Sequence, residues 1–198
     1  MKLHFGCGRN ILEGWLNLDL PGTNVAKPLQ FEDGTVDFIF HEHLLEHLDE
    51  VDGFNFIKEC HRILNPGGVL RITCPCIDGI VWVYQNWDSI PPSPWKKRHG
   101  DRNRFINNAI HFQTAWYKGK RFDLRGNPIK LNNPATAHKF LYDKEALRRK
   151  LVQVGFATIV RSVKRESTHP ELRGLESRFG GNFKHFPKEL EIILEATK

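Results

Sequence analysis

The sequence lacks the segments that direct proteins into or across membranes. Its first residues, MKLHFGCG, have no apolar stretch of the signal-peptide kind, and no other apolar run approaches membrane-spanning length. Cysteine is scarce: the four that occur are flanked by apolar residues typical of strands or helices, which indicates buried, reduced thiols. We therefore expect a cytoplasmic protein without a membrane span.

Internal repeats and low-complexity tracts are also missing. The 198 residues are enough for one domain of ordinary size and too few for two. An apolar fraction of 40% and five tryptophans support a real hydrophobic core, which excludes a disordered chain.

Acidic residues are nearly absent from one stretch. Residues 95–130 hold ten lysines and arginines against Asp101 and Asp123, a net charge of +8. The whole chain carries +6, so the remainder is slightly acidic and the basic character belongs to this stretch.

The first 80 residues alternate between strand-like and helix-like patterns. Apolar residues at helical spacing fill 54–64, and Asn-Pro-Gly-Gly at 65–68 then ends the helix. Strand, helix and strand in succession predict a parallel α/β sheet with a crossover helix. The expected strands are 2–5, 15–20, 36–40 and 69–74.

A second group of elements occupies the C-terminal third. Asp143 is the expected N-cap of a helix that Gly155 closes, and strands are expected at 156–160 and 190–196. The sequence therefore predicts a single domain over residues 1–198. Its core would combine 1–80 with 136–198, and residues 81–135 would be an insertion. Irregular segments of this length in a compact domain usually have a function.

Two features of the N-terminal segment indicate ligand binding. Gly6-Cys7-Gly8 directly follows the first strand, where the missing Cβ atoms let backbone N–H groups approach a ligand. Asp19 ends the second strand, where a carboxylate can accept hydrogen bonds from ribose hydroxyls. A Gly-x-Gly turn alone also fits a tight structural turn, so the combination carries the prediction.

Three segments together resemble the class I S-adenosylmethionine-dependent methyltransferases. They are "KLHFGCGRNILEGWLNLDL", "KPLQFEDGTVDFIFHEHLLEHL" and "ECHRILNPGGVLRITCP". Farther on, "AHKFLYDKEALRRKLVQVGF" and "STHPELRGLE" are similar to a subgroup of small bacterial methyltransferases, some linked to surface-polysaccharide synthesis. The resemblance implies a Rossmann-like α/β fold with a mostly parallel sheet and an antiparallel C-terminal strand.

The resemblance also implies a binding site for S-adenosylmethionine. Gly6, Cys7 and Gly8 would line the methionine end, and Asp19 would hold the ribose. Asn24 takes the position of the usual adenine-binding acid, so the charge there is lost. The first two helices of the family cannot both fit between these residues, which predicts a shortened cofactor half with a vestigial third strand.

Histidines follow the buried strand at 36–40, at the edge where cofactor and acceptor would meet. His41 or His43 is a candidate general base for an acceptor hydroxyl, with His41 also beside the cofactor. The alternative is that both shape the pocket and help to start a helix. His138 is a third catalytic candidate that would reach the site from the insertion, or else a capping or surface histidine.

His43-Leu-Leu-Glu46-His47 matches the H-x-x-E-H spacing of a class of zinc peptidases. A peptidase would still need a third protein ligand and a different fold around the helix, so no metal site is predicted. Residues 44–48 are instead expected to form the first turn of a helix, with Glu46 and His47 in structural roles. Arg173 and Glu176 could contact an acceptor, although an exposed ion pair is the ordinary interpretation.

Aromatic residues share the insertion with the basic stretch, and this pairing suits two kinds of acceptor. Sugars stack on tryptophan while cations neutralise attached phosphates, and RNA uses the same contacts. A Trp-rich lid with merely solvated charges is the third possibility. The aromatic residues are Trp82, Tyr84, Trp87, Trp95, Trp116 and Tyr117.

The sequence thus predicts S-adenosylmethionine-dependent methylation of a saccharide-containing or other small acceptor, on oxygen rather than nitrogen. An anionic acceptor would suit the basic stretch. An RNA methyltransferase is the first alternative. A catalytically inactive, methyltransferase-like binding protein is the second, because Asn24 and the shortened cofactor half depart from the family pattern.

Overall fold

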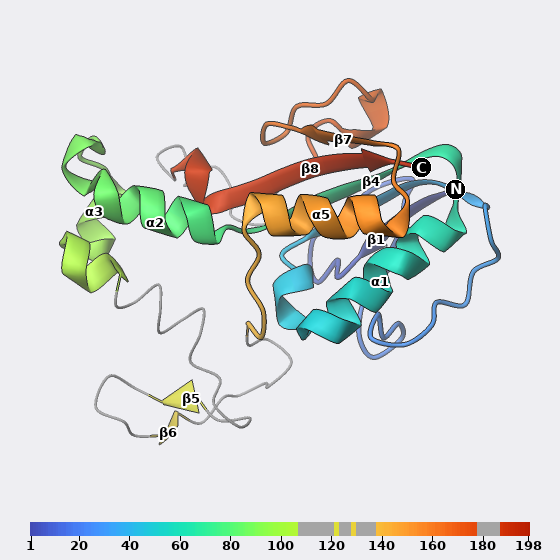
Figure 1. The fold of residues 1–198 in the computed structure, drawn as a ribbon, viewed down its shortest axis with the longest axis horizontal. Coiled ribbons are helices and arrows are strands. Elements are labelled where there is room, and N and C mark those ends of the chain that lie inside the picture. Colours follow the sequence, from blue (N-terminus) through green and yellow to red (C-terminus); the bar gives the residue numbers. More distant parts are fainter. Residues whose placement is uncertain (107–120, 123–127, 130–137, 178–186) are drawn as a thin grey trace.

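One six-stranded sheet organises the chain in the computed structural model, which describes residues 1–106, 121–122, 128–129, 138–177 and 187–198 (Figure 1). The strand order is β2-β1-β3-β4-β8-β7, and β8 alone of these six runs antiparallel to its neighbours. The strands are β1 (Lys2–Phe5), β2 (Leu16–Leu18), β3 (Val36–Glu42), β4 (Leu64–Pro75), β7 (Thr158–Arg161) and β8 (Glu191–Thr197). The predicted mostly parallel, Rossmann-like sheet with an antiparallel C-terminal strand is confirmed.

Two helices cover one face of this sheet and contact each other (Figure 1). The first, α1 (Glu50–Ile63), begins where the Asp49 carboxylate accepts a hydrogen bond from the Asp52 N–H. The second, α5 (Lys144–Val154), has the predicted N-cap Asp143 and ends at Gly155 in the left-handed conformation. The core under them includes Leu3, Phe5, Ile39, Phe56, Ile72, Leu147 and Leu151.

The predicted start of the crossover helix and the predicted start of the next strand were wrong, while the helix ends at Ile63 with Leu64 as its C-cap, close to the predicted end. The helix starts at Glu50 rather than at 54, because Asp49 supplies an N-cap before the apolar stripe begins. The Asn-Pro-Gly-Gly segment lies within β4 rather than before it, and β4 starts at Leu64.

A strap of chain, residues 162–177, packs against the opposite face of the sheet. Its Leu172 and Leu175 join Phe40 and Val69 in a small apolar cluster. Within the described part of the strap there is only a short 3₁₀ turn, η4 (Pro170–Leu172). Polar contacts hold the strap elsewhere along its length.

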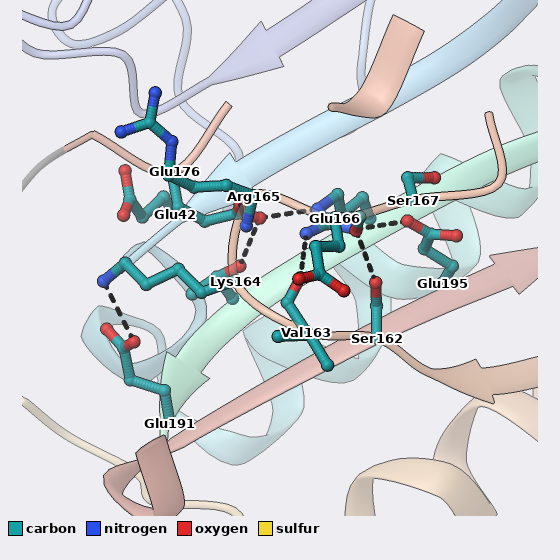
Figure 2. Close-up of polar contacts among 12 residues, drawn as sticks. Glu42, Ser162, Val163, Lys164, Arg165, Glu166, Ser167, Glu176, Glu191 and Glu195 are labelled. Carbon is teal, nitrogen blue, oxygen red and sulfur yellow. Dashed lines mark hydrogen bonds and ion pairs between the residues drawn. The ribbon is translucent and has the colours of Figure 1, made fainter. Parts of the chain in front are cut away.

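Arg71 of β4 is the centre of those polar contacts. Its guanidinium is fully buried and donates to Glu176 at 2.5 Å and to Glu195 of β8. It also donates to the Ser162 hydroxyl and the Glu166 carbonyl oxygen, both at 2.9 Å. The Arg165 N–H donates to the Glu176 carboxylate, and the Lys164 ammonium donates to the Glu191 carboxylate (Figure 2).

This network corrects the expectation for Glu176. The residue is 1% exposed and is held by Arg71, so it is neither in an exposed ion pair nor available to an acceptor. The sequence pattern gave no warning, because Arg71 and Glu176 lie far apart in the chain.

The N-terminal half is short, as predicted. The connections from β1 to β2 and from β2 to β3 contain neither a helix nor a third strand. Arg62 of α1 stabilises the second connection by donating to the carbonyl oxygens of Leu29 at 3.0 Å and Phe31 at 2.8 Å.

The insertion leaves the sheet at the end of β4. It begins with α2 (Ile77–Gln85), η2 (Trp87–Ser89) and α3 (Pro94–His99), which extend away from the sheet (Figure 1). A two-stranded sheet, β5 (Arg121–Phe122) with β6 (Pro128–Ile129), follows. Trp116 and Tyr117 lie outside the described residues.

Close backbone packing fixes the base of α2. A Cβ on Gly79 would come within 1.8 Å of the Glu189 carbonyl oxygen in η6 (Lys188–Leu190), so only glycine fits there. No helix among the described residues is long and apolar enough to cross a membrane.

Candidate functional site

The glycine turn and the end of β2 form one edge of the sheet. Gly6 and Gly8 have φ angles of +65° and +51°, and the N–H groups of Gly6 and Cys7 donate to the Leu18 carbonyl oxygen at 2.8 and 3.2 Å. A Cβ on Gly6 would lie 3.0 Å from the Leu44 side chain. The residues Gly6, Cys7, Gly8 and Asp19 are called the glycine edge.

Asp19 is exposed, and the glycine turn orients its carboxylate. Its Oδ2 accepts from the Gly8 N–H at 2.8 Å, and its Oδ1 accepts from the Leu20 N–H at 2.9 Å. Each oxygen keeps a lone pair for a further donor. The structure therefore brings together Gly6, Gly8 and Asp19, as the sequence predicted.

Two further predicted cofactor residues, Asn24 and Cys7, differ in their accessibility. Asn24 is exposed, and its Oδ1 accepts from the Ala26 N–H at 3.0 Å. Cys7 is buried. Its burial raises the pKa of the thiol, and the negative charge of Asp19 adds a smaller increase. Cys7 is therefore a neutral, packed thiol.

Asn10 was missed by the sequence analysis. Its main-chain N–H donates to the Cys7 carbonyl oxygen at 2.8 Å, which places it directly behind the glycine turn. Its side-chain Nδ2 is buried and has no hydrogen-bond partner among the described residues. The available signal was its position two residues after Gly8.

His43 occupies the turn after β3 and binds two carboxylates. Its φ angle is +52°, and its Nδ1 and Nε2 lie 3.0 Å from Glu46 Oε1 and 2.9 Å from Glu191 Oε1. Burial acts to lower the pKa of His43, but the hydrogen bonds and charges of Glu191 and Glu46 raise it to about 9. The imidazolium donates both ring protons, so neither nitrogen is open to accept one.

Glu46 is the shared acceptor of this region. It is fully buried, and burial acts to raise its pKa. The hydrogen bond and charge of His43, with smaller contributions from His47 and His138, lower the pKa of Glu46 to about 2. Glu46 is therefore a carboxylate.

His138 comes to the same carboxylate from the far end of the insertion. Its Nε2 lies 3.9 Å from Glu46 Oε1, and its ring is 4.8 Å from that of His47 in an edge-to-face arrangement. The N–H groups of Lys139 and Phe140 donate to the Glu46 carbonyl oxygen at 2.7 and 3.3 Å. The four residues His43, Glu46, His47 and His138 are called the histidine cluster.

His41 lies apart from this cluster. It is fully buried beside Phe56, with ring centroids 5.5 Å apart, and burial lowers the pKa of His41 to about 4. Neither ring nitrogen has a hydrogen-bond partner among the described residues. His41 therefore sits inside the core rather than at the open edge.

The expected helical turn at 44–48 was wrong in form. Residues Leu45–His47 make a separate 3₁₀ turn, η1, and Leu48 is extended before α1 begins. His43 and His47 consequently do not share a helix face, so the zinc-peptidase geometry is not formed.

A cavity of about 390 Å³ lies elsewhere, between α5 and the strands β7 and β8. Lys144, Arg148, Arg161 and Ile193 are among the residues that line it. None of the predicted site residues lines this cavity, so the glycine edge and the histidine cluster remain the candidate site.

Residues 18–72 match the family model described as "Methyltransferase domain". This segment runs from the end of β2 through β3 and α1 into β4, and it contains Asp19, His43 and Glu46. Among curated proteins, none matches the sequence.

Several solved structures share the fold of this chain. A SAM-dependent methyltransferase from Archaeoglobus fulgidus is 16% identical with a TM-score of 0.52, over 100% of this chain and 85% of its own. One from Methanosarcina mazei is 17% identical with a TM-score of 0.51, over 100% and 91%. One from Mesorhizobium loti is 14% identical with a TM-score of 0.50, over 100% and 90%.

The shared fold confirms the predicted Rossmann-like architecture, and residues 18–72 are similar to a methyltransferase domain. The residues of the glycine edge suit S-adenosylmethionine, the cofactor that the sequence predicts. The turn has no Cβ at Gly6 or Gly8 to block a ligand, and the Asp19 carboxylate is exposed beside it.

Proposed function

We propose that this protein transfers a methyl group from S-adenosylmethionine to a hydroxyl oxygen of a small, saccharide-containing acceptor. The observation that carries the proposal is the exposed Asp19 carboxylate, oriented by the Gly8 N–H at 2.8 Å beside a turn without Cβ atoms. Bound S-adenosylmethionine would supply an electrophilic methyl carbon on a sulfonium.

The glycine edge would bind the cofactor in three places. Gly6 and Gly8 would lie against the methionine end, Asp19 would accept the ribose hydroxyls, and Asn24 would face the adenine. The unpartnered Nδ2 of Asn10 would donate to the same ligand from behind the turn.

Methyl transfer depends mainly on alignment, and proton removal is secondary. His43 is a positioning residue in this proposal, because Glu46 and Glu191 occupy both of its ring nitrogens. His41 is too deeply buried to touch an acceptor. His47 and His138 are the imidazoles of the cluster that would face the acceptor side.

The insertion, residues 81–135, would form the acceptor wall of a single domain. Trp82 is 39% exposed on α2 and is suited to stack on a sugar face. Trp87 is only 5% exposed and packs on Phe105, so it belongs to the insertion's own core. Arg102 lies over the Tyr84 ring at 5.1 Å, which uses that cation internally and favours a small acceptor over RNA.

Calorimetry with S-adenosylhomocysteine tests the cofactor site. Asp19→Ala should weaken binding at least about tenfold, because it removes the ribose acceptor. Glu13→Gln changes an exposed acid in the connection from β1 to β2 and should bind like the wild type. Absence of wild-type binding at millimolar ligand would mean a non-enzymatic relative.

Transfer of labelled methyl groups tests the acceptor. Nucleotide-linked and lipid-linked saccharides should become labelled on oxygen, and Trp82→Ala should raise the acceptor KM more than it lowers kcat. Val81→Ala, at an exposed neighbour on α2, is the matched control. Label in RNA instead, with affinity that falls steeply as salt is added, would contradict the proposal.

A further inference from the structure

Glu46, His47 and His138 place three metal-ligating side chains together. Two come from η1 and the third from the segment that returns from the insertion. One ligand atom from each residue lies within 4.8 Å of the other two. Glu46 and His138 are buried, and His47 is half-buried.

Glu46 provides a second and independent observation. Its Oε1 accepts from His43, but its Oε2 is buried and has no hydrogen-bond partner among the described residues. An unsatisfied oxygen of a buried carboxylate is costly. The other oxygen, Oε1, lies 3.9 Å from His138 Nε2, so a cation bound by the carboxylate and the two imidazoles could also satisfy Oε2.

The backbone already holds the two segments together. The Glu46 carbonyl oxygen accepts from Lys139 and Phe140, so His138 is fixed next to η1 without any metal. His43 in turn orients the Glu46 carboxylate through its hydrogen bond to Oε1, as an outer hydrogen bond to a metal ligand commonly does.

We propose that Glu46, His47 and His138 form a binding site for a divalent transition metal ion, with zinc as the best match. Two imidazoles and one carboxylate are a zinc ligand set that leaves the fourth tetrahedral position open for water or for an acceptor oxygen. Tetrahedral ligands lie about 3.4 Å apart at zinc bond lengths, so small side-chain rotations complete the site.

This site differs from the one that the H-x-x-E-H spacing suggests. That motif would use His43, whose two nitrogens are committed to Glu46 and Glu191. The structure replaces it with His138, from the other end of the insertion. The metal would thereby tie the insertion to the connection between β3 and α1.

Metal analysis of the purified, tag-free protein tests the site. After treatment with a chelator, one equivalent of added Zn²⁺ should bind, and Co²⁺ in its place should give the intense visible bands of a tetrahedral ion. His47→Gln and His138→Gln should each weaken zinc binding at least about tenfold. His169→Gln, at a half-buried histidine on the opposite sheet face, should bind like the wild type.

Three results would overturn the proposal: substoichiometric zinc, octahedral cobalt spectra, or unchanged binding in both histidine variants. Loss of zinc on Cys76→Ser with retention in His47→Gln would also overturn it, because the ligands would then be thiolates. Circular dichroism of the metal-free variants shows whether they fold. S-adenosylhomocysteine binding to the same samples is measured separately, so failure of the metal site leaves the cofactor proposal standing.

Discussion

The glycine edge and the histidine cluster lie at the same edge of one sheet but are built in different ways. The glycine edge uses backbone turns and short-range contacts, such as Gly8 with Asp19. The histidine cluster joins β3 and η1 to Glu191 and His138, which are distant in sequence. Local contacts therefore form the proposed cofactor site, while tertiary packing forms the cluster that is proposed to lie on the acceptor side.

Removing Arg71 should cause the largest loss of stability and should disturb the histidine cluster. Arg71→Met leaves Glu176 and Glu195 buried without their cation, so the free energy of unfolding should fall by about 3–5 kcal/mol. Urea unfolding measures this loss. The strap also holds Glu191 through Lys164 and Glu42 through Ser177, so the histidine cluster should loosen with it.

A triple variant provides the control for Arg71. Replacing Arg71, Glu176 and Glu195 together by apolar residues should recover much of the loss, since no buried charge is left unpaired. If Arg71→Met alone costs less than about 1 kcal/mol, the network is not what holds the strap.

Gly6→Ala should distort the glycine edge and weaken ligand binding by an intermediate amount. The φ angle of +65° disfavours any Cβ, and the new methyl would meet Leu44 at 3.0 Å. A strain of about 1–2 kcal/mol in the turn predicts roughly tenfold weaker S-adenosylhomocysteine binding by calorimetry. Metal binding by the histidine cluster should not change.

Gly22→Ala is the matched control for Gly6→Ala. Its φ angle is not in the left-handed region, and the added Cβ would make an ordinary contact of 3.6 Å with the Asp19 carbonyl oxygen. Equal weakening by both substitutions would contradict the claim that the glycine turn specifically governs binding.

The smallest expected effect is on the pH dependence of stability, at the Glu59–Arg62 pair that holds the connection from β2 to β3. The hydrogen bond from Arg62 lowers the pKa of Glu59 below its ordinary value of 4.5. A lowered folded-state pKa stabilises the protein above the unfolded pKa, and this stabilisation is lost as the pH falls through the folded value. Stability should therefore decline below about pH 4.5.

Arg62→Met should flatten that part of the pH profile, with a change under about 1 kcal/mol because Glu59 and Arg62 are partly exposed. Thermal melts between pH 3 and pH 6 measure it. A wild-type profile as flat as the variant's would show that the pair contributes nothing to holding the connection.

The sequence was sufficient to predict the sheet and the glycine edge because their signals are local. Alternating apolar residues, Asp143 as N-cap and the Gly-Cys-Gly turn depend on neighbours in the chain. The connections from β1 to β2 and from β2 to β3 are too short to hold both of the first two helices usual in the family. Their absence could therefore be predicted from the number of residues in these connections.

The histidine cluster could not be assigned in the same way. The sequence left His43 as either a general base or a residue that shapes the pocket. In the structure, Glu191 from the last strand occupies its second nitrogen. Likewise, nothing local to Glu176 or Arg71 indicated that they pair. Such contacts depend on strand order, which brings β8 beside β4.

A crystal structure of the complex with S-adenosylhomocysteine tests the central claim most directly. The ribose hydroxyls should lie within hydrogen-bonding distance of Asp19, and the sulfur should point toward the histidine cluster. A ligand bound in the cavity beside α5, or a ribose away from Asp19, would contradict the account.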